Sequence, residues 1–164
     1  MKKTLDRASK EIAQYRGDIE KKLLEFSETD LLFFWSEKKD LFIKQQSLWQ
    51  PVISWAEDLL NVKIEKTDKL DTPDNSAMSK PLQMLFSEMS DKEFACYYAA
   101  ALNMKSVLLA LAMIKGKINA KTAGELSYLE ELWQNEKWGS DNEAVKRRNE
   151  RCSELDEIER YLKK

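Results

Sequence analysis

The sequence predicts a mainly α-helical fold: an orthogonal domain of about six helices with a minor two-stranded β element. Three observations predict this fold class. Apolar residues recur at three- and four-residue steps through most of the chain, which is the spacing of one apolar helix face. Two capping boxes, Ser90–Glu93 and Ser140–Glu143, mark helix starts. The 164 residues are 43% apolar and 34% charged, which excludes a disordered chain and suits a single globular domain over residues 1–164.

The first half of the chain is expected to contain both strands and the helices at residues 4–27 and 40–60. An apolar stripe predicts a first helix over residues 4–27. The apolar run at 29–35 fits either a buried strand or a helix start, and we favour a short strand. Residues 40–60 are helical again, and Pro51 is expected to open a second segment there because it cannot donate a backbone hydrogen bond. Residues 61–65 alternate polar and apolar side chains, so they are the second strand.

The second half is predicted to be helical throughout, after a loop. Residues 67–80 are rich in turn formers and poor in large apolar side chains, so they form the main loop. Pro81 opens a short helix that ends at Met89. The capping box at Ser90–Glu93 starts a long helix, which continues until Gly116 supplies a permissive C-terminal residue.

Two further helices complete the expected fold. Asn119 is a suitable N-cap for a helix that runs to Gly139. The second capping box starts the final helix, whose narrow apolar stripe includes Val145, Leu155 and Leu162.

Charge and composition exclude several classes of function. The 27 basic and 29 acidic residues give a net charge of −2, so no overall positive charge attracts nucleic acid. The chain has no histidine, which removes the commonest general base and zinc ligand. Its four glycines stand singly, so no glycine-rich loop can hold a phosphate. The ordinary routes to catalysis are therefore mostly closed, and we expect no catalytic residues, no metal site and no cofactor, although the carboxylates described below keep one enzyme hypothesis open.

The chain also lacks signals for export or membrane insertion. The most apolar stretch, Phe94 to Ile114, carries Asn103, Lys105 and Ser106 in its middle, so a core helix is favoured over a membrane span. The N-terminus runs directly into a charged amphipathic pattern instead of an apolar signal core. Cys96 and Cys152 are far apart and show no metal-binding spacing, which favours a reducing compartment. These features predict a protein without membrane insertion.

The segment Tyr128–Gly139 holds the candidate functional side chains. It combines three carboxylates with two tryptophans: Glu130, Glu131, Glu136, Trp133 and Trp138. Paired carboxylates can perform acid–base chemistry or bind a hard cation, whereas carboxylates on a helix surface are usually only solvated. A carboxylate-based hydrolase is therefore one hypothesis. The tryptophans either fill the core or anchor a protein interface.

A basic cluster, Lys146–Arg151, offers a nucleic-acid-binding module as another hypothesis. Between residues 140 and 164, however, seven basic residues are matched by seven acidic ones. Balanced charge at helical spacing is typical of a solvated, salt-bridged face. We therefore expect no nucleic-acid partner, and keep a helical interaction or nucleic-acid-binding module as the alternative function.

Four segments, in order, resemble landmarks of one protein family. They are Thr29–Leu32, the run Gln45-x-x-x-Trp49-x-Pro51-x-x-x-Trp55-Ala56, the small-residue helix Ser106–Ala112 followed by Gly116, and Leu126–Gly139. The last is similar to the family pattern Ser-x-Leu-Asp/Glu-Glu-x-Trp-Gln-x-Glu-x-Trp-Gly. Together they resemble the C-terminal helical domain of the ATP synthase α-subunit assembly chaperones of mitochondria and α-proteobacteria. Asn103 and Lys105 depart from the smaller, less charged residues of that family.

This resemblance implies a dedicated, non-enzymatic chaperone. Such a protein binds the unassembled α-subunit of the ATP synthase F(1) sector and shields the apolar surface that awaits the β-subunit. Beside the family, this chain begins about where the N-terminal β domain would end, so that domain is expected to be absent from it. We expect a monomer. The bacterial cytoplasm is the expected location, with the mitochondrial matrix as the alternative. The motif match makes Glu130, Glu131, Trp133, Glu136 and Trp138 the candidate partner-binding residues.

Overall fold

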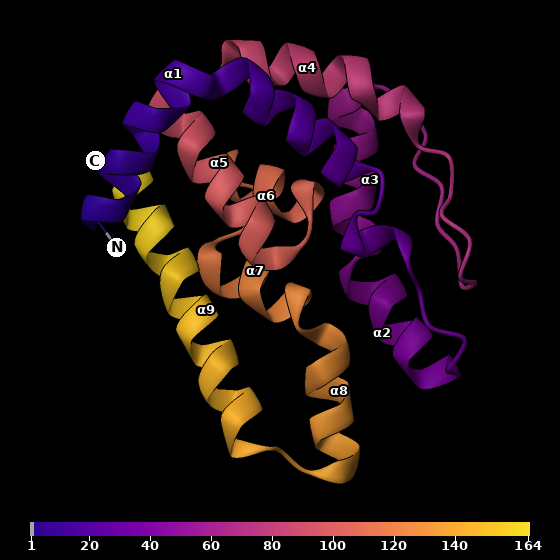
Figure 1. Ribbon diagram of the computed structural model, residues 1–164. Coiled ribbons are helices and arrows are strands. Elements are labelled where there is room, and N and C mark those ends of the chain that lie inside the picture. The colour runs from indigo at the N-terminus through magenta and orange to yellow at the C-terminus, as the bar shows by residue number, and fades with distance from the viewer. Residues whose placement is uncertain (1) are drawn as a thin grey trace.

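The computed structural model describes residues 2–164, and the side chains of residues 5–164. It is mainly helical, as predicted, but this range contains nine α-helices instead of about six (Figure 1). The α-helices are α1 Lys2–Ser27, α2 Lys39–Leu48, α3 Gln50–Leu60, α4 Ser79–Glu88, α5 Asp91–Met104, α6 Val107–Ile114, α7 Ala120–Ser127, α8 Leu129–Trp138 and α9 Asn142–Leu162; two 3-10 helices, η1 Leu31–Phe33 and η2 Ser76–Met78, lie between them.

The core is built around α6. Every residue from Val107 to Met113 is buried, so this helix is apolar on all sides and lies in the centre of the molecule. Helices α5, α3, α7, α1 and α9 all contact it. In Figure 1, α1 and α4 cover one end of this centre, while the hairpin of α8 and α9 extends from the other.

The long helix predicted from Ser90 to Gly116 is wrong, because the chain breaks it into α5 and α6. Lys105 ends α5 in the left-handed region, with φ 56°. The Ser106 hydroxyl accepts a hydrogen bond from the Leu109 N–H at 3.0 Å and so caps α6. The same hydroxyl donates to the buried Asp30 carboxylate at 2.7 Å, and the other Asp30 oxygen accepts from the Leu108 N–H at 3.0 Å. A residue from a distant part of the chain therefore stabilises the break.

The predicted two-stranded β element is also wrong. Within residues 2–164 the structure contains no strand. Residues 31–33 form η1, which is capped by the Asp30 carboxylate through the Leu32 N–H. One isolated parallel bridge joins Phe34 to Thr67, where the Thr67 carbonyl accepts from the Trp35 N–H at 2.8 Å. Thr67 lies outside the predicted second strand at 61–65, so the two predicted strands do not pair, and the 3-10 turn at Leu31–Phe33 takes up the apolar run.

The helix predicted from Asn119 to Gly139 is likewise divided. Asn119 caps it as predicted, through the Thr122 N–H at 2.8 Å. Tyr128 then departs from helical geometry, with φ −106° and ψ 19°, and separates α7 from α8. Gly139, with φ 81°, makes the turn into α9, which Asp141 caps through the Glu143 N–H at 3.2 Å.

Two other helix signals are confirmed, whereas α4 begins at Ser79 ahead of the predicted start at Pro81, and Asp141 caps α9 instead of Ser140. Ser90 caps α5 through the Glu93 N–H at 3.1 Å, and Pro51 lies in the first turn of α3. Cys96 and Cys152 are free thiols. Among the helices of the described residues, none combines the length and the apolar character that a bilayer crossing requires.

Candidate functional site

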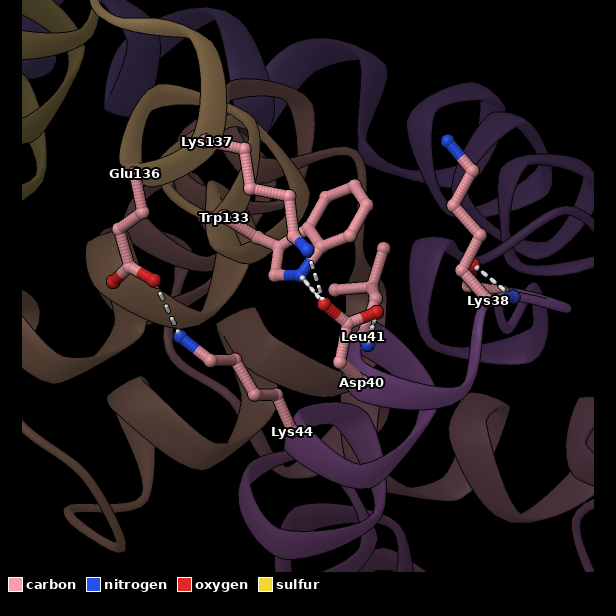
Figure 2. Close-up of polar contacts among 8 residues, drawn as sticks. Lys38, Asp40, Leu41, Lys44, Trp133, Glu136 and Lys137 are labelled. Carbon is pink, nitrogen blue, oxygen red and sulfur yellow. Dashed lines mark hydrogen bonds and ion pairs between the residues drawn. The ribbon is translucent and has the colours of Figure 1, made fainter.

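The candidate residues lie on α8 and near its contacts with two other helices. Helix α8 packs against α2 on one flank and leads through Gly139 into α9. Figure 2 shows the flank that faces α2, where polar side chains of the two helices meet.

Trp133 is the anchor of α8 on α2. Its side chain is buried, with 4% exposed, and its indole Nε1 donates to Asp40 Oδ2 at 3.0 Å (Figure 2). Lys137 Nζ lies 2.7 Å from the same oxygen. The hydrogen bond from Lys137, followed by the one from Trp133, lowers the pKa of Asp40 below its ordinary value. The core role of Trp133, one of the two alternatives left open by the sequence, is therefore the one that the geometry supports.

Trp138 has the opposite environment. It is 69% exposed at the C-terminal end of α8. Its ring packs edge-on against Trp133, with ring centroids 5.7 Å apart and planes at 84°. Lys38 Nζ lies over both rings, 5.2 Å from the centroid of Trp133 and 5.6 Å from that of Trp138. Trp138 thus contacts Trp133 and Lys38 on one side and presents most of its surface to solvent.

The three carboxylates of α8 do not form one cluster of paired acids. Glu131 forms an ion pair with Arg148 of α9, at 3.2 Å. Glu136 forms one with Lys44 of α2, at 3.1 Å (Figure 2). Glu130 is exposed. Since Glu131 and Glu136 contact helices on different flanks of α8, the arrangement gives no support to the paired-carboxylate hydrolase, which needs two acids around one reacting group.

Helix α2 adds exposed apolar side chains that the sequence analysis missed. Phe42 and Ile43 are partly exposed, and Phe42 packs edge-on against Trp35 with ring centroids 5.4 Å apart. The signal was present in the sequence. Leu41, Phe42 and Ile43 are consecutive, and a helix with one buried face cannot bury three consecutive side chains. Only Leu41 is buried.

The described residues offer no candidate metal centre. No group of three or more acidic or cysteine side chains between residues 5 and 164 is placed to hold an ion.

Comparisons with known proteins agree with the motif resemblance. Residues 1–57 match the family model of the ATP12 chaperone protein. The structure is similar to that of Atp12 from Paracoccus denitrificans, with 26% identity and a TM-score of 0.88, over 94% of this chain and 67% of that one. It is also similar to a protein of Agrobacterium tumefaciens described as a candidate chaperone, with 26% identity and a TM-score of 0.78, over 93% of this chain and 58% of that one. The resemblance to this chaperone family is therefore confirmed, whereas the α8 residues lie outside the segment that the family model matches.

Proposed function

We propose that this chain is an assembly chaperone that binds the unassembled α-subunit of the ATP synthase F(1) sector and prevents its aggregation until the β-subunit arrives. The similarity to the ATP12 chaperone family and to Paracoccus Atp12 supports the chaperone class. The choice of the α-subunit rests on the motif resemblance. In this proposal the chain acts as a monomer, without nucleic acid, cofactor or chemistry of its own, in the compartment where the F(1) sector assembles.

The observation that carries the proposal is the exposed Trp138, on the helix whose sequence resembles the family motif. An unassembled subunit exposes apolar surface that would otherwise aggregate. A chaperone must cover that surface and later release it. Large aromatic side chains dominate the binding energy of such interfaces. The contacts of Trp138 with Trp133 and Lys38 restrict its side chain in part, which reduces the conformational freedom that it loses on binding.

The five candidate residues have different roles in this proposal. Trp138 contacts the client directly. Glu130 and Glu136 supply charge at the rim, and Trp133 fixes α8 to α2. Glu131 is directed towards α9, where it pairs with Arg148. The exposed apolar side chains of α2 extend the surface.

Co-expression with an ATP synthase α-subunit tests the proposal. The wild-type chain should increase the recovery of soluble α-subunit and be recovered in complex with it. Trp138→Ala should lower complex recovery by more than about tenfold, the effect of losing an aromatic hot spot. Met84→Ala is the matched control, because Met84 on α4 is 67% exposed and lies on a different helix. No capture by the wild-type chain, or equal capture by both variants, contradicts the proposal.

A further inference from the structure

A basic cavity lies on the other flank of α8. It has a volume of about 290 Å³ and opens between the C-terminal end of α5, the turn between α7 and α8, and the first half of α9. Its wall includes four basic side chains, Lys105, Arg147, Arg148 and Arg151, but a single carboxylate, Glu131.

Arg148 and Glu131 form the inner edge of the cavity. The Arg148 side chain is only 14% exposed, and its Nη1 lies 3.2 Å from Glu131 Oε1. Arg151 Nη1 donates to the Asn103 carbonyl at 3.4 Å, a long bond that leaves the rest of its guanidinium free for another acceptor. Two of the arginines are therefore held in place by contacts that do not use all of their donors.

The positive charge of the cavity is not balanced within the described residues. Glu131 compensates Arg148, but neither Lys105 nor Arg147 makes an ion pair among residues 5–164. This excess is local, since the chain as a whole has a net charge of −2. Like charges that line one cavity repel each other, and an anion bound among them removes that cost.

We propose that this cavity binds a carboxylate presented by an acidic segment of the client protein. The inference rests on the proposed function, because it assigns the carboxylate to the client. Guanidinium groups bind carboxylates through two parallel hydrogen bonds, and Arg147 and Arg151 lie one helical turn apart on α9. Glu131 already pairs with Arg148, so the site accommodates a carboxylate beside this row of arginines.

The remaining wall favours an acidic side chain over inorganic phosphate. Leu31, Met104 and Tyr128 give the cavity an apolar side, which suits the methylene groups of a glutamate side chain. Glu131 repels a doubly charged phosphate more strongly than a singly charged carboxylate. The incoming carboxylate binds Arg147 and Arg151 and shares Arg148 with Glu131.

Peptide binding to the full chain tests the site directly. The probe is a fluorescein-labelled, acetylated and amidated penta-glutamate peptide, followed by fluorescence anisotropy at low salt, with the penta-glutamine peptide as the neutral control. The double variant Arg147→Gln, Arg151→Gln should weaken binding by at least about tenfold, as expected for the loss of charged hydrogen bonds. The control is Lys146→Gln, Arg160→Gln, which removes the same charge from the same helix outside the cavity and should change affinity less than about twofold.

Several results would overturn the inference. Equal losses in the two double variants would show attraction to the whole helix surface, and tight binding of the glutamine peptide would exclude carboxylate recognition. Displacement of the peptide by inorganic phosphate, but not by acetate at the same ionic strength, would make the cavity a phosphate site. Circular dichroism checks folding, and Arg147→Gln alone serves as a second variant, because Arg147 is exposed and forms no ion pair within residues 5–164.

Capture of the α-subunit separates this inference from the proposed function. If the wild-type chain captures the subunit and the Arg147→Gln, Arg151→Gln variant captures it less than its control does, both are supported. Undiminished capture by that variant overturns the inference and leaves the proposed function standing. Failure of the wild-type chain to capture the subunit contradicts the proposed function and the client assignment, whatever the peptide binds.

Discussion

Asp30 is a buried acidic residue that joins three parts of the chain. Its side chain has no exposed surface, and its two oxygens accept hydrogen bonds from the Leu32 N–H, the Ser106 hydroxyl and the Leu108 N–H. Burial disfavours the ionised form and outweighs these hydrogen bonds, which raises the pKa of Asp30 from 3.8 to about 6.

This pKa makes stability depend on pH. Between pH 3.8 and about 6 the folded chain holds a proton on Asp30 that the unfolded chain has lost. The stabilisation is therefore complete below pH 3.8, declines as the pH rises towards 6, and is lost above that value. Asp30→Asn removes this titration, so the stability of wild type relative to the variant should fall by about 2 kcal/mol between pH 4 and pH 7.

Urea unfolding of both proteins at a series of pH values measures this difference, and subtraction removes the other carboxylates that titrate in the same range. Gln14→Asn, an exposed change on α1 that alters no ionisable group, is the control and should give a difference that does not vary with pH. If the relative stability of the wild type instead rises with pH, the hydrogen bonds to the ionised form dominate over burial.

Glu136→Lys tests whether the carboxylate at the rim of the proposed client surface contributes to binding. Glu136 has a largely exposed side chain whose ion pair with Lys44 contributes little to stability. The variant should therefore fold normally and capture less α-subunit in a pull-down. Glu88→Lys, an equal change of charge on the exposed surface of α4, should capture as much as wild type. Equal capture by both would remove Glu136 from the surface.

Among the elements, the joint between α5 and α6 depends on an unusual backbone conformation. Lys105 has φ 56°, a left-handed conformation that costs a residue with a Cβ atom about 1 kcal/mol. Lys105→Gly should thus stabilise the fold by up to about 1 kcal/mol in urea unfolding. Lys105→Ala removes the same side chain but keeps the Cβ atom, so it should show no such gain. A similar effect of both changes would trace the result to the lost charge.

The contact between α7 and α9 is made possible by a glycine. A Cβ atom on Gly124 would lie 2.9 Å from Cys152 Sγ. Gly124→Ala should therefore destabilise the fold by about 1 kcal/mol, since the clash exceeds the gain in helix propensity. With Cys152→Ala in the background the clash disappears and Gly124→Ala should become stabilising. Thermal unfolding of the four proteins measures the coupling, and additive effects would contradict this account.

The boundaries of these elements show how far the sequence could predict the fold. Periodicity and caps predicted where α1, α5 and α7 begin, because those signals depend on neighbouring residues. The breaks at Lys105 and Tyr128 were missed, since the apolar pattern continues across both positions. The first break depends on Asp30, whose approach is set by tertiary packing. The motif likewise identified α8, but the burial of Trp133 and exposure of Trp138 depend on where α2 packs.

At the scale of the whole molecule, the fold consists of an apolar centre around α6 and a more polar extension formed by α8. Helix α6 is buried along its length and is surrounded by five other helices. In α8 only Leu129 and Trp133 are buried, and much of its contact with neighbouring helices is made by ion pairs and by Trp133. Exposed ion pairs contribute little to stability. Helix α8, which carries the candidate residues, should therefore open at a lower free energy than the core.

Hydrogen exchange should show this difference directly. Amides of α6 should exchange only through global unfolding, whereas amides of α8 should exchange through a local opening of lower free energy. Trp133→Phe, which removes the hydrogen bond to Asp40, should speed exchange in α8 and leave α6 unchanged. Binding of the α-subunit should slow exchange in α8, because Trp138 and the carboxylates around it become covered. If amides of α8 and α6 exchange with the same opening free energy in the free protein, the molecule unfolds as one unit and α8 is as stable as the core.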